Sequence, residues 1–370
     1  MAQGVHLTVA LEGAGWHPAA WREPEARPGE LVTAGYWSDL VGEAERGLLD
    51  FVTIHDSFAP GPDRADLVRG RLDAVQIASR VAPRTRGIGL VPAAIATHTE
   101  PFHLSKSIAT LDYVSLGRAG LSVEISGDPD TAEHFGRREF PQPEDDLYDE
   151  AADYVEVVRR LWDSWEDDAE IRDAATGRFI DREKLHYIDF IGKWFSVKGP
   201  SITPRPPQGQ PLVAAFARNE AGYRLAERAA DIVFVAEPAA LRGRAERAGR
   251  PLLVFADLVV FLDEDERKAA SRKARLDELA GAEYTADTRI FTGTPAGLAD
   301  ELLALREAGV TGFRLRPGAI PHDLTAITRG LVPELRRRGA FRDGYDAPTL
   351  RGLLGLTRPA NRYADQRSGK

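Results

Sequence analysis

The sequence of 370 residues predicts an α/β fold, specifically a (β/α)8 TIM barrel with insertion segments. Short apolar runs alternate with stretches in which apolar residues recur every three or four positions, the pattern of parallel strands each followed by a helix. Within residues 87–125, an apolar run, a helical pattern and a second apolar run follow one another at short spacing. We interpret this segment as one βαβ unit. Because parallel barrels bind ligands at the carboxyl ends of their strands, we expect the functional residues there.

The first half of the chain contains four predicted pairs of strand and helix. The strands are the apolar runs 5–11, 51–54, 87–91 and 121–125. The helices are the periodic stretches 36–47, 67–79, 101–117 and 148–165. The third helix illustrates the reasoning, because it starts at Pro101, which suits a first turn, and ends at Gly117.

The second half resumes the alternation after a gap. Predicted strands are 212–216, 232–235, 252–261 and 312–315, and predicted helices are 221–230 and 324–337. Residues 166–210 contain a charged stretch, two short apolar runs at 186–191 and 194–197 and a proline-rich exit, so we expect an insertion that contains a hairpin. A second insertion is expected at 276–294, near the mouth of the barrel. The arginine-rich tail from residue 344 is expected to lie along the surface or to cross to another subunit.

Composition favours one barrel domain over residues 1–370 and limits the function classes. The 48 basic and 57 acidic residues give a net charge of −9 and the basic residues are dispersed, so we expect neither a nucleic-acid partner nor an anionic membrane surface. The absence of cysteine excludes a disulfide, a thiolate metal site and a thiol nucleophile. No apolar run approaches about 18 residues and no secretory leader is evident, so a cytoplasmic enzyme is expected.

Two polar residues follow predicted strands at positions suited to ligand binding. Asp56 lies in the sequence TIHDSF after the second strand, and Thr97 follows the third strand. A carboxylate can accept hydrogen bonds from a ligand, and a hydroxyl group can both donate and accept them. The alternatives are that Asp56 satisfies backbone donors of its own loop and that Thr97 is an ordinary turn residue.

The segment AAFARNEAG, residues 214–222, predicts a phosphate site. A strand runs into Asn219, a good N-cap residue, immediately before a helix. Backbone N–H groups at a helix N-terminus bind anions, and the side chain of Arg218 can pair with a phosphate group.

His17 follows the first strand in GWHPAAWR and is a candidate catalytic residue. Because an imidazole titrates near neutral pH, it can act as a general acid or base. The alternative is a structural histidine packed between Trp16 and Trp21.

A metal-dependent barrel hydrolase is a rival class, with ligands drawn from the strand ends. The candidate ligands are His55, Asp56, His98 and Glu124. No compact metal-ligand motif such as HExxH occurs, so no metal site is predicted.

The sequence TLDYVSLGRAG, residues 110–120, resembles a block of the bacterial luciferase-like flavin-dependent monooxygenases, in particular their nitrilotriacetate and alkane monooxygenase branch. Further blocks occur in the family's order and span nearly the whole chain. They are GWHPAAWR (15–22), AERGLLDFVTIHDS (44–57), the stretch 185–211, the stretch 293–315, VPELRRRGAFR (332–342) and TLRGLLGLTRPANR (349–362).

The resemblance implies a two-component monooxygenase. A separate NAD(P)H-dependent flavin reductase would supply reduced FMN, with which this protein would use dioxygen to oxidise a small organic substrate. The resemblance places Asp56 and Thr97 beside the flavin ring, Tyr148 near the phosphate-bearing tail and His17 in the active-site cavity. It also implies a homodimer or homotetramer.

The chain departs from the family pattern around the expected cofactor site. Asn219 stands where relatives usually carry Ser, Arg218 replaces a small residue, and Glu144 stands where relatives have His or another neutral polar residue. Residues 121–126 read LSVEIS where many relatives read WNVVTS. These departures leave two alternatives open, a deazaflavin-dependent oxidoreductase of the same superfamily and a non-catalytic flavin-binding protein.

Overall fold

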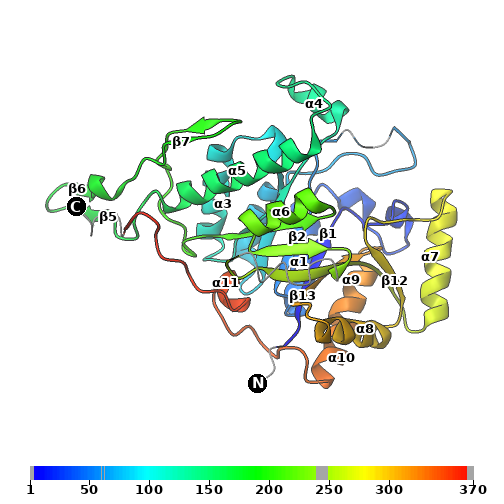
Figure 1. Cartoon of the computed structure of the whole chain (residues 1–370). Coiled ribbons are helices and arrows are strands. Elements are labelled where there is room, and N and C mark those ends of the chain that lie inside the picture. Colours follow the sequence, from blue (N-terminus) through cyan, green and yellow to red (C-terminus); the bar gives the residue numbers. More distant parts are fainter. Residues whose placement is uncertain (1–3, 60, 62, 239–248, 365–370) are drawn as a thin grey trace.

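The computed structural model describes residues 4–59, 61, 63–238 and 249–364, and its centre is a closed barrel of eight parallel strands (Figure 1). The strands are β1 (His6–Leu11), β2 (Phe51–Ile54), β3 (Gly89–Ile95), β4 (Gly120–Glu124), β9 (Leu212–Ala217), β10 (Ile232–Val235), β11 (Leu253–Leu262) and β13 (Gly312–Pro317). Each pairs in parallel with the next, and β13 pairs with β1 to close the barrel. The predicted (β/α)8 fold is confirmed.

Helices surround the barrel (Figure 1). The main ones are α1 (Ala34–Arg46), α2 (Ala74–Val81), α3 (Pro101–Val114), α5 (Glu144–Asp163), α6 (Glu220–Ala229), α8 (Pro295–Glu307), α9 (His322–Ala326) and α10 (Val332–Arg337). Side chains of Thr33, Asp73, Asn219 and Thr294 accept hydrogen bonds from the first turns of the helices that follow them. The short helix α4 (Pro129–Phe135) lies away from the barrel body (Figure 1).

Two helix starts differ from the predictions. The helix predicted at 67–79 begins only at Ala74, because Asp73 caps it and residues 67–72 form an irregular loop. Gly70 in that loop adopts φ +90°, a conformation that does not continue a helix. The helix predicted from Tyr148 begins four residues earlier, at Glu144, where three acidic side chains in the first turn favour the positive end of the helix dipole.

The two segments predicted as insertions contain regular structure. Residues 166–210 hold two antiparallel hairpins, and the predicted one pairs β7 (Phe190–Ile191) with β8 (Ser196–Val197). The other pairs β5 (Glu170–Asp173) with β6 (Arg178–Ile180). Residues 276–294 include the end of α7 (Glu266–Ala280) and strand β12 (Arg289–Gly293), which extends the barrel sheet beside β11. Neither α7 nor β12 was predicted.

Part of the C-terminal segment covers the amino-terminal end of the barrel, whereas residues 356–364 lie mostly at the surface, as predicted for the tail. The predicted crossing of the tail to another subunit stays a prediction. Leu350 at the start of α11 (Leu350–Leu353) is fully buried and packs in one cluster with the barrel residues Phe51 and Leu212. The chain then runs toward the β5–β6 hairpin (Figure 1), where Asn361 donates hydrogen bonds to the carbonyl oxygens of Asp163 and Trp165.

Truncating Leu350 should therefore destabilise the whole barrel. We expect Leu350→Ala to lower the free energy of unfolding by about 3 kcal/mol, since it leaves a cavity beneath the strands. Ile191→Ala is the control, because Ile191 is 86% exposed and its truncation should change stability by less than about 0.5 kcal/mol. Urea denaturation measures both, and an equally small loss for Leu350→Ala would show that the tail does not hold the barrel closed.

Candidate active site

A buried cluster of charges spans β11 and β13 inside the barrel. Arg314 donates two hydrogen bonds to the carboxylate of Asp257, at 2.8 and 2.7 Å, and Arg316 pairs with the same carboxylate. The side chain of Asp257 has no exposed surface. Burial alone would raise the pKa of Asp257, but the two guanidinium groups outweigh it and hold the pKa below its usual value. Asp257 is therefore a fixed negative charge between two cations.

This cluster extends to the carboxyl ends of other strands. Arg316 also donates to Asp287 at 2.6 Å, and Asp287 pairs with Arg218, at the end of β9, at 2.6 Å. The guanidinium of Arg316 lies 4.4 Å from the centre of the Trp16 ring, a cation–π contact. The cluster thus connects β11 and β13 to the loop after β1 and to the end of β9.

Asp56 and Thr97 both hydrogen-bond to backbone groups in this structure. The two carboxylate oxygens of Asp56 accept from the N–H groups of Ser57 and Ala74, at 2.8 and 2.9 Å. Asp56 thereby joins the end of β2 to the first residue of α2. The hydroxyl oxygen of Thr97 accepts from the N–H of Ser126 at 3.0 Å, which links the segments that follow β3 and β4. Their predicted contact with a flavin ring stays a prediction.

Asn219 caps α6 as the sequence predicted. Its amide oxygen accepts from the N–H of Gly222 at 2.8 Å, while its amide nitrogen donates to a carboxylate oxygen of Glu144 at 2.6 Å. The ring of Tyr148 packs against Gly222, in the first turn of α6. A Cβ atom built on Gly222 would lie 3.4 Å from the Tyr148 ring and 3.1 Å from the Cα of Ala217. The fold therefore brings together Glu144, Tyr148 and Asn219 at the N-terminus of α6.

Arg218 points toward Asp287, with which it forms the ion pair described above. Its side chain is 59% exposed, and its guanidinium also lies 4.8 Å from the ring centre of Phe216. The predicted pairing of Arg218 with a phosphate would compete with this ion pair.

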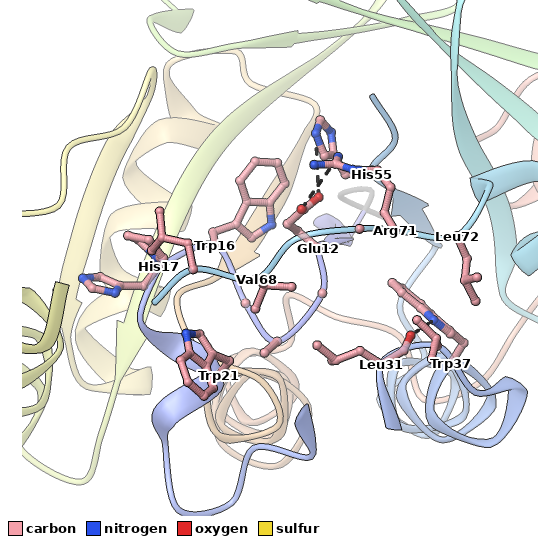
Figure 2. Close-up of a pocket in the computed structure, with 17 residues that line it drawn as sticks. Glu12, Trp16, His17, Trp21, Leu31, Trp37, His55, Val68, Arg71 and Leu72 are labelled. Atoms are coloured by element: carbon pink, nitrogen blue, oxygen red, sulfur yellow. Dashed lines mark hydrogen bonds and ion pairs between the residues drawn. The ribbon is translucent and has the colours of Figure 1, made fainter. Parts of the chain in front are cut away.

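His17 is held by hydrogen bonds on both ring nitrogens. Nδ1 accepts from the N–H of Ala19 at 3.1 Å, so Nε2 carries the proton and donates to Asp277 at 3.0 Å. The side chain has no exposed surface and packs against Phe261 and Tyr284. Burial lowers the pKa of His17 and outweighs the effect of Asp277. In Figure 2 the ring points away from Glu12 and Arg71, toward the far side of the site.

A cavity of about 230 Å³ lies beside the barrel mouth (Figure 2). Three indoles, Trp16, Trp21 and Trp37, contribute to its apolar walls. Its charged or titratable lining groups include Glu12, His55 and Arg71. Glu12 and Arg71 were not predicted as site residues, and His55 was expected as a candidate metal ligand. The position of Glu12 in the sequence could have identified it as a site residue. Glu12 is the first residue after β1 and therefore lies at the carboxyl end of a strand.

The polar residues of the cavity form a loose charged group. Carboxylate oxygens of Glu12 lie 3.7 Å from Nε2 of His55 and 3.9 Å from Nη1 of Arg71. Burial and the nearby arginines, Arg71 first among them, lower the pKa of His55 to about 3, so this imidazole is neutral at pH 7. Burial raises the pKa of Glu12, and Arg71 opposes that rise.

The proposed ligands of a metal-dependent hydrolase do not form a metal site. Asp56 binds backbone groups at the start of α2, whereas His98 stacks on Phe135 with ring centres 4.8 Å apart. Across the described part of the chain, no three His, Asp or Glu side chains are grouped in a way that would hold a metal ion. That alternative therefore finds no support in the described residues.

Removing the charge of Asp257 should unfold the barrel mouth. We expect Asp257→Asn to destabilise the protein by about 3–5 kcal/mol, because it leaves the buried Arg314 and Arg316 without their shared counter-ion. Asp39→Asn serves as the control, since Asp39 is 61% exposed in its pair with Arg27 and its loss should cost less than about 1 kcal/mol. Thermal unfolding measures both, and equal losses would contradict the role given to Asp257.

Comparison with known proteins identifies the family of this chain. The sequence model of the family described as luciferase-like monooxygenase matches residues 16–284. The chain is 31% identical to the N-acetyl-S-(2-succino)cysteine monooxygenase of Bacillus subtilis and 30% identical to nitrilotriacetate monooxygenase component A of Aminobacter aminovorans. Both alignments cover 97% of this chain and 98% of the relative.

Solved structures show the same fold. A riboflavin lyase crystallised with modified FMN and riboflavin has a TM-score of 0.87 at 27% identity, covering 97% of this chain and 98% of that one. The long-chain alkane monooxygenase LadA has a TM-score of 0.85 at 24% identity and covers 96% of both chains. No helix in the described residues has the length and apolar character needed to cross a membrane. From the family match over most of its length and its eight-stranded parallel barrel, we conclude that the chain belongs to the luciferase-like monooxygenase family, as its sequence blocks predicted.

Proposed function

We propose that this protein is the oxygenating component of a two-component system and that it uses reduced FMN and dioxygen to oxidise a small organic substrate. One structural observation carries the proposal. The N-terminus of α6, where Glu144, Tyr148 and Asn219 meet, lies at the carboxyl ends of the strands, beside a barrel interior that contains Arg314 and Arg316. A helix N-terminus suits a phosphate group, and buried cations suit an electron-rich ring.

The residues present fit FMN with one exception. The start of α6, Asn219 and Tyr148 would hold the phosphate, and Arg218 would add a positive charge beside them. Glu144 is the exception, because its carboxylate hydrogen-bonds to Asn219 at the same helix end and would repel a phosphate. When bound, the reduced flavin would supply the activation of dioxygen. The protein would bind and orient the flavin and the substrate and exclude water from the site.

We propose that Asp56 and Thr97 position the flavin-binding surface, because their hydrogen bonds hold the loops after β2, β3 and β4 in place. For His17 we propose a positioning role. Its hydrogen bonds to Ala19 and Asp277 fix the loop that carries Trp16 and Trp21, which form one wall of the cavity. In this role His17 would act on the substrate through the shape of the cavity and would transfer no proton.

A separate NAD(P)H-dependent flavin reductase is the partner we propose. Several relatives carry names that denote one part of a larger system, among them nitrilotriacetate monooxygenase component A and subunits A and B of pristinamycin IIA synthase of Streptomyces pristinaespiralis. We further propose a homodimer or homotetramer in the cytoplasm, with a single barrel domain into which residues 166–210 and 276–294 are inserted.

The deazaflavin alternative has weaker support. Two deazaflavin-dependent enzymes of known structure share the fold with TM-scores of 0.64 and 0.65, at 16% and 15% identity. The alkane monooxygenase and the riboflavin lyase reach 0.85 and 0.87. We therefore favour FMN.

Anaerobic titration of the purified protein with reduced FMN tests the proposal. We expect saturable binding and, after oxygen is admitted, oxidation of the bound flavin at a rate different from that of free reduced FMN. Binding of a reduced deazaflavin in place of reduced FMN would favour the deazaflavin alternative. Binding of reduced FMN with no oxygen incorporated from ¹⁸O₂ into any substrate would favour the non-catalytic flavin-binding protein.

Glu144 should weaken the binding of FMN but not of riboflavin, which lacks the phosphate. We expect Glu144→Gln to tighten FMN binding about three- to tenfold, a modest gain because the side chain is exposed and solvent screens its charge. Glutamine retains an oxygen that can accept from Asn219. Asp145→Asn is the matched control, since it removes a charge from the same helix turn but pairs with Arg224. An equal gain for riboflavin would show that Glu144 does not face the phosphate.

A further inference from the structure

We propose that the cavity beside the barrel mouth binds the organic substrate and selects a small uncharged molecule with an apolar, ring-sized body and one hydrogen-bonding head group. This inference rests on the proposed monooxygenase function and adds the class of substrate. Its size follows from the cavity volume of about 230 Å³, which lies below the usual range for drug-sized ligands.

The walls of the cavity are the reason why we expect a substrate with an apolar body. All three indole N–H groups of the cavity donate to backbone carbonyl oxygens at 2.8–3.1 Å: Trp16 to Ala10, Trp21 to Asp66 and Trp37 to Leu31. Because these donors are already occupied, the tryptophans offer a ligand only the apolar surfaces of their rings.

The rim of the cavity is apolar as well. Val32, Val68 and Leu72 line it and are exposed by 67%, 41% and 37%. Large aliphatic side chains exposed together around a concave site indicate a surface that an apolar ligand covers.

One end of the cavity is polar, and its groups leave room for a ligand. Figure 2 shows the Glu12 carboxylate directed toward His55 and Arg71. The separations of 3.7 and 3.9 Å are too long for hydrogen bonds, and within the described residues no other side chain bonds to this carboxylate. A head group placed here can therefore accept from Arg71 and donate to Glu12.

The charges at this end balance. Among the lining groups, the carboxyl group of Glu12 faces the guanidinium of Arg71 at 3.9 Å, one acidic and one basic group, and burial together with the nearby arginines keeps His55 neutral. A charged substrate would neutralise one of the pair and leave the other without a counter-ion in a partly buried site, which costs binding energy. A neutral group that both donates and accepts, such as an amide, satisfies both residues.

The balance between Glu12 and Arg71 predicts that this cavity does not bind the anionic compounds named in some relatives. Nitrilotriacetate, named in one relative, and EDTA, named in one structural neighbour, carry several carboxylates each. The single arginine of this cavity, already balanced by Glu12, does not match such anions. Long-chain alkanes and dimethyl sulfide, named in other relatives, are uncharged.

Three probes of nearly equal shape test the inference: benzamide, benzoate and benzylamine. Quenching of tryptophan fluorescence reports their binding, because three of the six tryptophans of the chain line the cavity. We expect benzamide to bind at least tenfold more tightly than either charged probe, and nitrilotriacetate not to bind. Tighter binding of benzoate or nitrilotriacetate to the unmodified protein would overturn the inference.

Two variants should change the relative binding of the three probes, one in favour of the anion and the other in favour of the cation. Glu12→Gln leaves Arg71 unbalanced, so benzoate should gain at least tenfold relative to benzamide. Arg71→Gln leaves Glu12 unbalanced, so benzylamine should gain instead. Arg69→Gln is the matched control, because Arg69 lies on the same loop, is 59% exposed and pairs with Asp63 outside the cavity lining. An unchanged order of probes in both variants would also overturn the inference.

Titration of each variant with reduced FMN separates the two proposals. If the probes follow the predicted order but no protein binds reduced FMN, the monooxygenase function fails and the selectivity of the cavity stands. If reduced FMN binds and the probe order is wrong, the function stands and the proposed substrate class fails.

Discussion

The carboxylate of Asp257, buried between Arg314 and Arg316, is the interaction on which the barrel mouth depends. Barrel interiors are usually filled by aliphatic side chains, whereas here two guanidinium groups and a carboxylate occupy that space. Burying these three charges costs desolvation free energy, so the cluster contributes more to the orientation of the side chains around it than to the free energy of folding. It directs Arg316 toward Trp16 and Asp287, and Asp287 in turn holds Arg218. The aromatic wall of the cavity and the end of β9 therefore take their positions from one buried charge.

The fold could be predicted from the sequence because its signal is periodic and local. Alternating apolar runs and helical stretches located all eight strands, and the cap at Asn219 followed from its residue type and position. What was missed depends on tertiary packing. Leu350 fills the barrel only because strands far away in the sequence surround it, and Arg71 reaches Glu12 from an irregular loop without a periodic pattern. The family and its monooxygenase class were predicted from sequence blocks, and the comparisons confirm them.

The departures from the family pattern are not independent of one another. Glu144 and Asn219 are 75 residues apart in the sequence and share a hydrogen bond of 2.6 Å. The asparagine amide caps α6 with its oxygen and binds Glu144 with its nitrogen, so one side chain serves both contacts. In the sequence, Glu144 and Asn219 are two separate departures from the family pattern. In the structure they form one altered site at the N-terminus of α6, where we propose that the phosphate binds.

The position of Leu350 also has a consequence for biosynthesis. β1 (His6–Leu11) pairs with β13 (Gly312–Pro317), and Leu350, which fills the base of the barrel, follows β13 in the chain. A ribosome produces the first strand long before its partner, and its tunnel still encloses the last few tens of residues when the final strand is made. The edge of β1 must therefore stay unpaired through most of translation, which exposes it to aggregation. The barrel can therefore close only after β13 and Leu350 have both left the ribosome.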